Sequence, residues 1–140
     1  MERLTLTVLT VGLGLLVASP NDAVAQSKAP PGGAYKVVSK LVPLPSFLPG
    51  LGTLYVDPAT LPAGPFLAYD NQGKLVSSIY MIPLKDLNGQ KAFNGLTVAH
   101  ERADHVDIVF NAGHPGVAEP HYHVILWYIS TQRAAAQLAK

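Results

Sequence analysis

Cysteine is absent from the sequence, and charged residues are scarce. The lack of cysteine among 140 residues excludes a disulfide framework and a catalytic thiol. Ten basic and nine acidic residues give a net charge of only +1, which provides no electrostatic footprint for nucleic acid or an anionic membrane surface. Stability must therefore come from packing, from a bound ion or from self-association, and a homo-oligomer is one expected state.

The first 25 residues have the three-part form of a secretory signal peptide. Arg3 supplies the positive start, residues 4–18 are apolar apart from threonine and glycine, and residues 23–25 form an A-x-A cleavage site. The apolar run is shorter than the roughly 20 residues that a membrane-spanning helix needs. We predict cleavage after Ala25, export to the periplasm or the medium, and no stable membrane anchor afterwards.

Proline and glycine distinguish residues 26–50 from the rest of the chain. Because proline fixes φ and lacks an N–H donor, this segment is expected to be an arm without a long helix or a central strand. Tyr35 to Val42 can form an edge strand. Residues 51–140 are predicted to form a single β-rich domain.

Short apolar segments separated by turn residues follow the arm. His105 to Phe110 alternates between polar and apolar residues, which predicts a half-buried strand, whereas the apolar and aromatic run from His121 to Ser130 predicts a central strand covered on both faces. The other expected strands are Thr53 to Asp57, Phe66 to Asp70, Leu75 to Ile82 and Leu96 to Ala99, and the expected helices are a short turn after Pro83 and Thr131 to Lys140. The predicted fold is mostly β, a small antiparallel barrel or sandwich with a Pro-rich N-terminal arm and a short C-terminal helix.

All five histidines lie between residues 100 and 123. His121 and His123 are two residues apart on a predicted strand, so their side chains share a face. In an antiparallel hairpin the start of one strand lies beside the end of its partner, which places this pair nearer to Val109 than to His105.

The connection over residues 111–120 is expected to complete this site. It carries His114 and Glu119, so the predicted cluster is His114, His121 and His123, with Glu119 or His105 as a fourth partner. Three interpretations remain open. The cluster can bind a divalent transition metal whose identity the sequence does not give. It can act as a general acid or base oriented by a carboxylate. It can also be a histidine-rich turn with a structural role.

The run from His105 to Tyr128 resembles a small bacterial family of unknown function, typified by a thermophile protein under sigma-E/anti-sigma-E control. Gly113-His114-Pro115 matches a G-H-x-P element with the proline one place early, and Pro120-His121 matches the following P-H element. Residues 62–84 are similar to the family's earlier turn and strand, so the resemblance covers about residues 50–130. It implies a β-rich domain, an oligomer and no established activity, and it carries His114 and His121 as site candidates.

The sequence departs from both family patterns, which limits the site residues that the resemblances imply. His123 stands where the family pattern has an acid, and Ile125 stands where it has a second histidine, so the role of His123 rests on strand geometry alone. The H-x-H pair also resembles the start of the cupin metal motif, but that motif continues with a glutamate, and residues 124–129 are apolar.

Two functional hypotheses follow. The first is an exported β-domain protein that binds a divalent metal at the histidine cluster, without a nucleotide or organic cofactor. The second is a non-enzymatic binding or assembly domain of the cell envelope whose histidines are structural. The sequence does not decide whether the protein is an enzyme.

Overall fold

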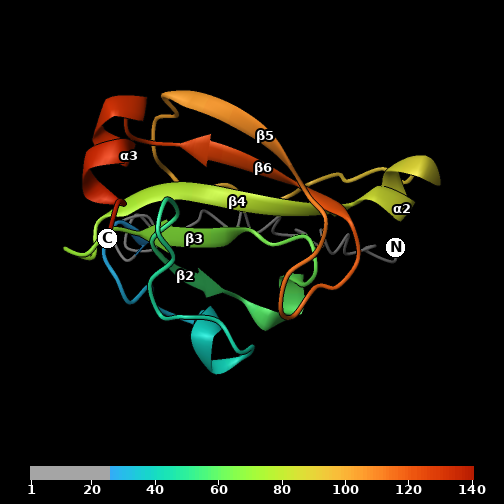
Figure 1. Cartoon of the computed structure of the whole chain (residues 1–140), viewed down its shortest axis with the longest axis horizontal. Helices are drawn as coiled ribbons and strands as arrows, with labels where there is room; N and C mark the ends of the chain where they lie inside the picture. Colours follow the sequence, from blue (N-terminus) through green and yellow to red (C-terminus); the bar gives the residue numbers. More distant parts are fainter. Residues whose placement is uncertain (1–25) are drawn as a thin grey trace, which may run out of the picture.

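A computed structural model describes residues 26–140, and the predicted signal peptide lies outside these residues. Six strands form one antiparallel sheet with the order β1-β2-β3-β4-β6-β5 (Figure 1). The mostly β, antiparallel class is therefore confirmed. The strands are β1 (Lys36–Val37), β2 (Thr53–Val56), β3 (Phe66–Tyr69), β4 (Leu75–Pro83), β5 (His105–Asn111) and β6 (His121–Trp127).

Short helices flank this sheet. The predicted C-terminal helix is confirmed as α3 (Thr131–Gln137), and its N-cap is Ser130, whose side chain accepts a hydrogen bond from the Arg133 backbone N–H. The other helices are α2 (Leu84–Asn88) and the 3-10 turns η1 (Val38–Lys40) and η2 (Pro58–Thr60). Figure 1 shows α3 and α2 near opposite ends of the sheet. Among residues 26–140, no helix has the length and apolar character needed to cross a membrane.

The middle of the sheet is buried on both faces. Every residue of β3 and β4 is buried, because the apolar side chains of one face join the main core while those of the other face meet a smaller cluster. The main core contains residues from both ends of the chain, including Val38, Ile79, Ile125, Trp127 and Leu138. The smaller cluster contains Leu67, Tyr69, Leu75 and Ala99.

The Pro-rich segment packs along the sheet and contributes to the main core. Val38 is buried, and Val42, Leu44 and Phe47 pack against the same core. Only Lys36 and Val37 of the expected edge strand pair with β2, as β1. Proline thus limits regular structure here, as predicted, but the apolar side chains between the prolines are still buried.

The strand expected at Leu96 to Ala99 does not form. The backbone there is irregular, and the Thr97 carbonyl accepts a hydrogen bond from the Tyr80 hydroxyl at 2.6 Å. A tyrosine side chain on β4 therefore satisfies a group that a sheet ladder would otherwise use. Ala99 is buried in the smaller apolar cluster.

β5 and β6 are less buried than the sequence predicts. β6 lies between β4 and β5, as predicted for an interior strand, but Tyr122, Val124 and Leu126 on one face are only partly buried. β5 is an edge strand, and its apolar face is exposed: Ile108 has 68% of its surface in solvent. The prediction of a half-buried β5 was therefore wrong, because alternation identifies an apolar face without showing that anything covers it.

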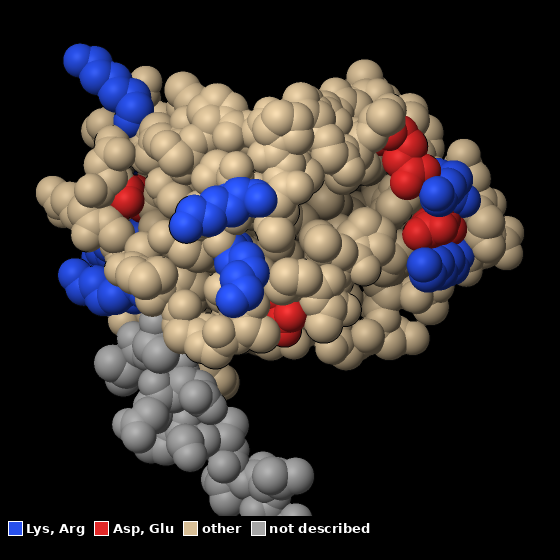
Figure 2. All heavy atoms as spheres, turned by 90° about the horizontal axis from the view of Figure 1, so that it is seen from below, with Lys and Arg blue, Asp and Glu red and all other residues tan. Residues whose placement is uncertain are grey.

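Charged side chains cover little of the surface. Figure 2 shows a face made mostly of uncharged residues, with acidic and basic side chains meeting near one end. This distribution agrees with the low charge content of the sequence.

Candidate metal centre

The pairing of β5 with β6 fixes where the histidines lie. His123 is opposite Val109 and His121 is opposite Asn111, whereas His105 is opposite Trp127 at the other end of the ladder. The hairpin geometry predicted from the sequence is therefore confirmed. The connection after β5 turns back at this end of the sheet (Figure 1) and brings His114 to the pair.

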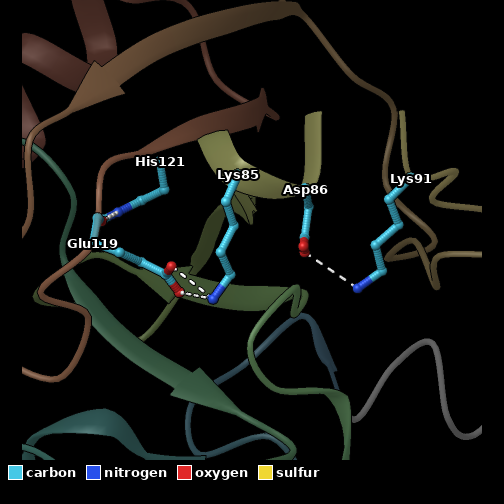
Figure 3. Close-up of polar contacts among 5 residues, drawn as sticks. All are labelled: Lys85, Asp86, Lys91, Glu119 and His121. Carbon is cyan, nitrogen blue, oxygen red and sulfur yellow. Dashed lines mark hydrogen bonds and ion pairs between the residues drawn. The ribbon is translucent and has the colours of Figure 1, made fainter. Parts of the chain in front are cut away.

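His121 is fully buried at the start of β6. Its Nδ1 lies 2.7 Å from the backbone carbonyl oxygen of Glu119 (Figure 3). Because a carbonyl can only accept, Nδ1 carries the proton and Nε2 presents a lone pair. That Nε2 lies 3.0 Å from His123 Nε2.

His114 is held in a similar way by the loop that carries it. A pair of 2.9 Å backbone hydrogen bonds joins His114 and Val117 in a tight turn. The His114 Nδ1 donates to the Pro115 carbonyl at 3.0 Å, which leaves its Nε2 free to bind a ligand. Backbone carbonyls therefore fix the tautomers of two of the three histidines, as outer partners do in metal sites.

The three rings converge on one point. Their centroids are 4.8 Å apart for His121 and His123, 4.9 Å for His114 and His121, and 5.6 Å for His114 and His123. One ring nitrogen from each lies within 4.8 Å of the others. A transition metal forms bonds of about 2.0–2.1 Å to imidazole nitrogen, so the donor atoms of a tetrahedral site lie about 3.4 Å apart. The three rings would therefore have to move slightly closer together to bind one ion.

Burial keeps His123 neutral. Desolvation, reinforced by the neighbouring His121 and His114, lowers the pKa of His123 from 6.5 to about 4. Because the neutral imidazole is the form that binds metals, His123 is ready to act as a ligand near pH 7.

Glu119 and His105, the two proposed fourth partners, lie elsewhere. The Glu119 carboxylate forms an ion pair with Lys85 at 2.8 Å (Figure 3), so Glu119 reaches the cluster only through its backbone carbonyl. His105 lies 2.8 Å from an Asp104 carboxylate oxygen and stacks on Trp127 with centroids 6.0 Å apart. The structure brings together His114, His121 and His123 and places these two side chains outside the cluster.

The hydrogen bonds of the cluster favour metal binding over acid–base chemistry. In residues 26–140, the recorded partners of its rings are backbone carbonyls and one another. A general base of the kind expected from the sequence needs an orienting carboxylate, and none of these contacts supplies one. Three neutral imidazoles are a familiar ligand set for zinc and related ions.

An apolar pocket adjoins the cluster, and the sequence did not predict it. Its volume is about 260 Å³, and its lining includes His114 and His123. Leucine and valine side chains of residues 38–51 form one wall, opposite side chains of β2, β3 and β4. The leucine-rich composition of residues 41–51 indicated packing, but not that the packing would leave a cavity beside the histidines.

Protein kept metal-free with a chelator should lose folding stability in acid, because the pKa of His123 is lowered. Since the folded-state pKa of about 4 lies below the ordinary value of 6.5, the unfolded chain binds more protons between these values, and stability falls as pH falls from about 6.5 to about 4. The urea midpoint should therefore drop more for the wild type than for His123→Gln between pH 7 and pH 4.5. Equal drops in the two proteins would contradict this role for His123.

Comparison with solved structures identifies a similar protein. The chain is similar to the crystal structure of hypothetical protein TTHB210 from Thermus thermophilus, with 47% sequence identity and a TM-score of 0.63. The match covers 69% of this chain and 94% of the Thermus chain. No protein-family model and no curated protein matches the sequence.

Proposed function

The chain belongs to the family of the Thermus thermophilus protein TTHB210, and we propose that it is a small protein that binds one divalent transition metal through His114, His121 and His123. The observation that carries the proposal is the convergence of three ring nitrogens within 4.8 Å. Two of these histidines have their Nδ1–H groups bonded to carbonyls, so their Nε2 atoms carry the lone pairs that would bind the ion. In His121 the ion would replace the 3.0 Å contact with His123 Nε2.

The ligand set narrows the choice of ion. Imidazole suits zinc, copper, nickel and iron better than calcium or magnesium, which prefer oxygen ligands. Three protein ligands also leave one position of a tetrahedral ion open, as in catalytic zinc sites. The arrangement therefore supports zinc or a similar ion with an exchangeable fourth ligand.

A thermal-shift series tests the proposal. An ion that binds only the folded state at 100 times its Kd adds about 2.7 kcal/mol of stability, which corresponds to roughly 10 °C in Tm for a domain of this size. We expect such a rise with zinc, nickel or copper and little change with magnesium. Equal, negligible shifts with all four ions would reject the metal function.

A second candidate function is assembly, supported by the exposed face of β5 and β6. Val106, Ile108 and Phe110 are each more than half exposed. They lie opposite the partly buried Leu126, Val124 and Tyr122 of β6, so that the two strands form one apolar surface. β5 also has an unpaired edge, which is suited to another chain.

We expect this surface to mediate self-association into a homo-oligomer. Ile108→Lys should shift the mass measured by light scattering at micromolar concentration toward the monomer, because it would bury an unpaired charge in the contact. Val98→Lys provides a matched control, since Val98 is an exposed valine in the loop before β5. A monomeric wild type, or an unchanged mass for Ile108→Lys, would argue against assembly through this face.

Export is a further proposal, and it rests on the signal-peptide pattern of the sequence. An N-terminus at Gln26 in the mature protein would support it.

A further inference from the structure

The apolar pocket and the histidine cluster share residues. His114 and His123 belong to the cluster and also line the pocket. His121 is fully buried and is not among the lining residues. An ion held by the three histidines would therefore have the pocket on its accessible side.

The pocket itself is almost entirely aliphatic. Val42 and Leu44 approach from the Pro-rich segment, and Leu51 follows that segment directly. Leu54, Ile79 and Met81 approach from the sheet. Apart from the two histidines, the only polar side chain among the described lining residues is Asn111. This arrangement, with an apolar interior and a few polar groups, is typical of sites for small apolar ligands.

The charge of a bound divalent ion indicates which polar group a ligand of this pocket would carry. Three neutral imidazoles leave the double positive charge of a divalent ion uncompensated, and that ion would be the largest charge in the site. The described lining residues include no aspartate, glutamate, lysine or arginine. An anionic donor brought by the ligand would supply the missing negative charge.

The volume limits the ligand's size. An apolar cavity of about 150 Å³ is enough for benzene. A pocket of about 260 Å³ can therefore hold a chain of roughly six to ten carbons. This volume lies just below the usual range for small-molecule sites.

We propose that the metal centre and the pocket form one binding site for a small apolar monocarboxylic acid. Its carboxylate occupies the fourth position of the metal, and its hydrocarbon chain fills the pocket against Leu44, Leu51 and Leu54. This assignment rests on the proposed metal function and adds the class of ligand.

Calorimetric titration of the full chain with octanoate tests the assignment. Each buried methylene contributes a factor of about 4 in affinity, so zinc-loaded protein should bind octanoate at least about 100-fold more tightly than acetate. Removing zinc with a chelator should weaken octanoate binding at least tenfold. Octylamine, which carries the same chain with a positive head, should bind zinc-loaded protein far more weakly than octanoate.

Two leucine variants distinguish the contribution of the pocket to octanoate binding from that of the metal. Leu44→Trp places a larger side chain in the pocket and should reduce octanoate affinity at least tenfold without changing zinc affinity. Leu87→Trp is the matched control, because Leu87 is 44% exposed on α2 and lies outside the lining. If Leu44→Trp does not fold, the smaller change Leu51→Phe serves the same purpose.

The outcomes distinguish this inference from the proposed function. Absence of zinc binding rejects both. Zinc binding with equal affinity for octanoate and acetate leaves the metal function standing and overturns the ligand assignment. Octanoate binding that does not depend on zinc also overturns it. Failure of zinc-loaded protein to bind octanoate, together with a change of oligomeric state in Leu44→Trp, would assign the pocket to a second copy of the chain instead.

Discussion

His121→Asn is expected to weaken zinc binding at least about 100-fold while the sheet remains folded. Removing an outer partner of a metal ligand typically weakens metal binding 10- to 100-fold. His121 is itself a proposed ligand, so its loss should weaken binding by at least the upper end of that range. Asparagine keeps an N–H group near the position of Nδ1, where it can still donate to the Glu119 carbonyl. It removes Nε2, which lies 3.0 Å from His123 Nε2.

Asparagine is preferred to alanine because His121 has no solvent-exposed surface. Alanine would leave a cavity and strip the Glu119 carbonyl of its partner, which costs about 1–3 kcal/mol for an unsatisfied buried group. Competition against a chromophoric zinc chelator measures the affinity, and urea unfolding measures the stability. Unchanged zinc affinity in His121→Asn would remove His121 from the ligand set.

Two control variants address the fourth partners predicted from the sequence. Glu119→Gln should leave zinc affinity within about twofold of the wild type, because the Glu119 carboxylate is paired with Lys85 and only its backbone faces the cluster. His105→Ala should behave in the same way, since His105 lies at the far end of β5. A large loss in either variant would mean that the site rearranges when metal binds.

Gly113→Ala should have the second-largest effect, a loss of roughly 10- to 100-fold in zinc affinity. Gly113 has a φ of +132°, and a Cβ added there would lie 2.5 Å from the Ala118 carbonyl oxygen. The two backbone segments would have to separate, and His114 is the next residue along the chain. Displacement of a ligand side chain by about 1 Å is enough to impair a site.

Gly95→Ala provides the matched control for backbone strain. Gly95 also has a positive φ, +65°, but an added Cβ would meet nothing within 4 Å. Both variants are destabilised by about 1–2 kcal/mol through the left-handed conformation, yet only Gly113→Ala should lose zinc affinity. Equal zinc affinity in the two variants would show that the turn does not position His114.

Local patterns explain which parts of the fold could be predicted. β4 and the turn before it could be predicted, because residues 71–75 combine turn residues with the start of a long apolar strand. The approach of His121 and His123 to the end of β5 followed from strand periodicity and hairpin direction, both of which are properties of neighbouring residues.

Contacts between distant residues explain what was missed. The Glu119 side chain turns to Lys85, which is 34 residues away in the sequence, and the pocket exists because residues 38–51 fold back over the sheet. Single-sequence patterns do not encode such contacts. The exposure of Ile108 was missed for a related reason, because a pattern shows an apolar face but not its partner.

The metal content of the protein tests the central claim most directly. Full-length protein without a histidine tag should be saturated with zinc, dialysed against metal-free buffer and analysed for zinc per chain. The account predicts about one zinc per wild-type chain and none above the buffer level in the folded double variant His121→Asn/His123→Gln. No retained zinc in the wild type, or equal zinc in both proteins, would contradict the assignment of His114, His121 and His123 as a metal centre.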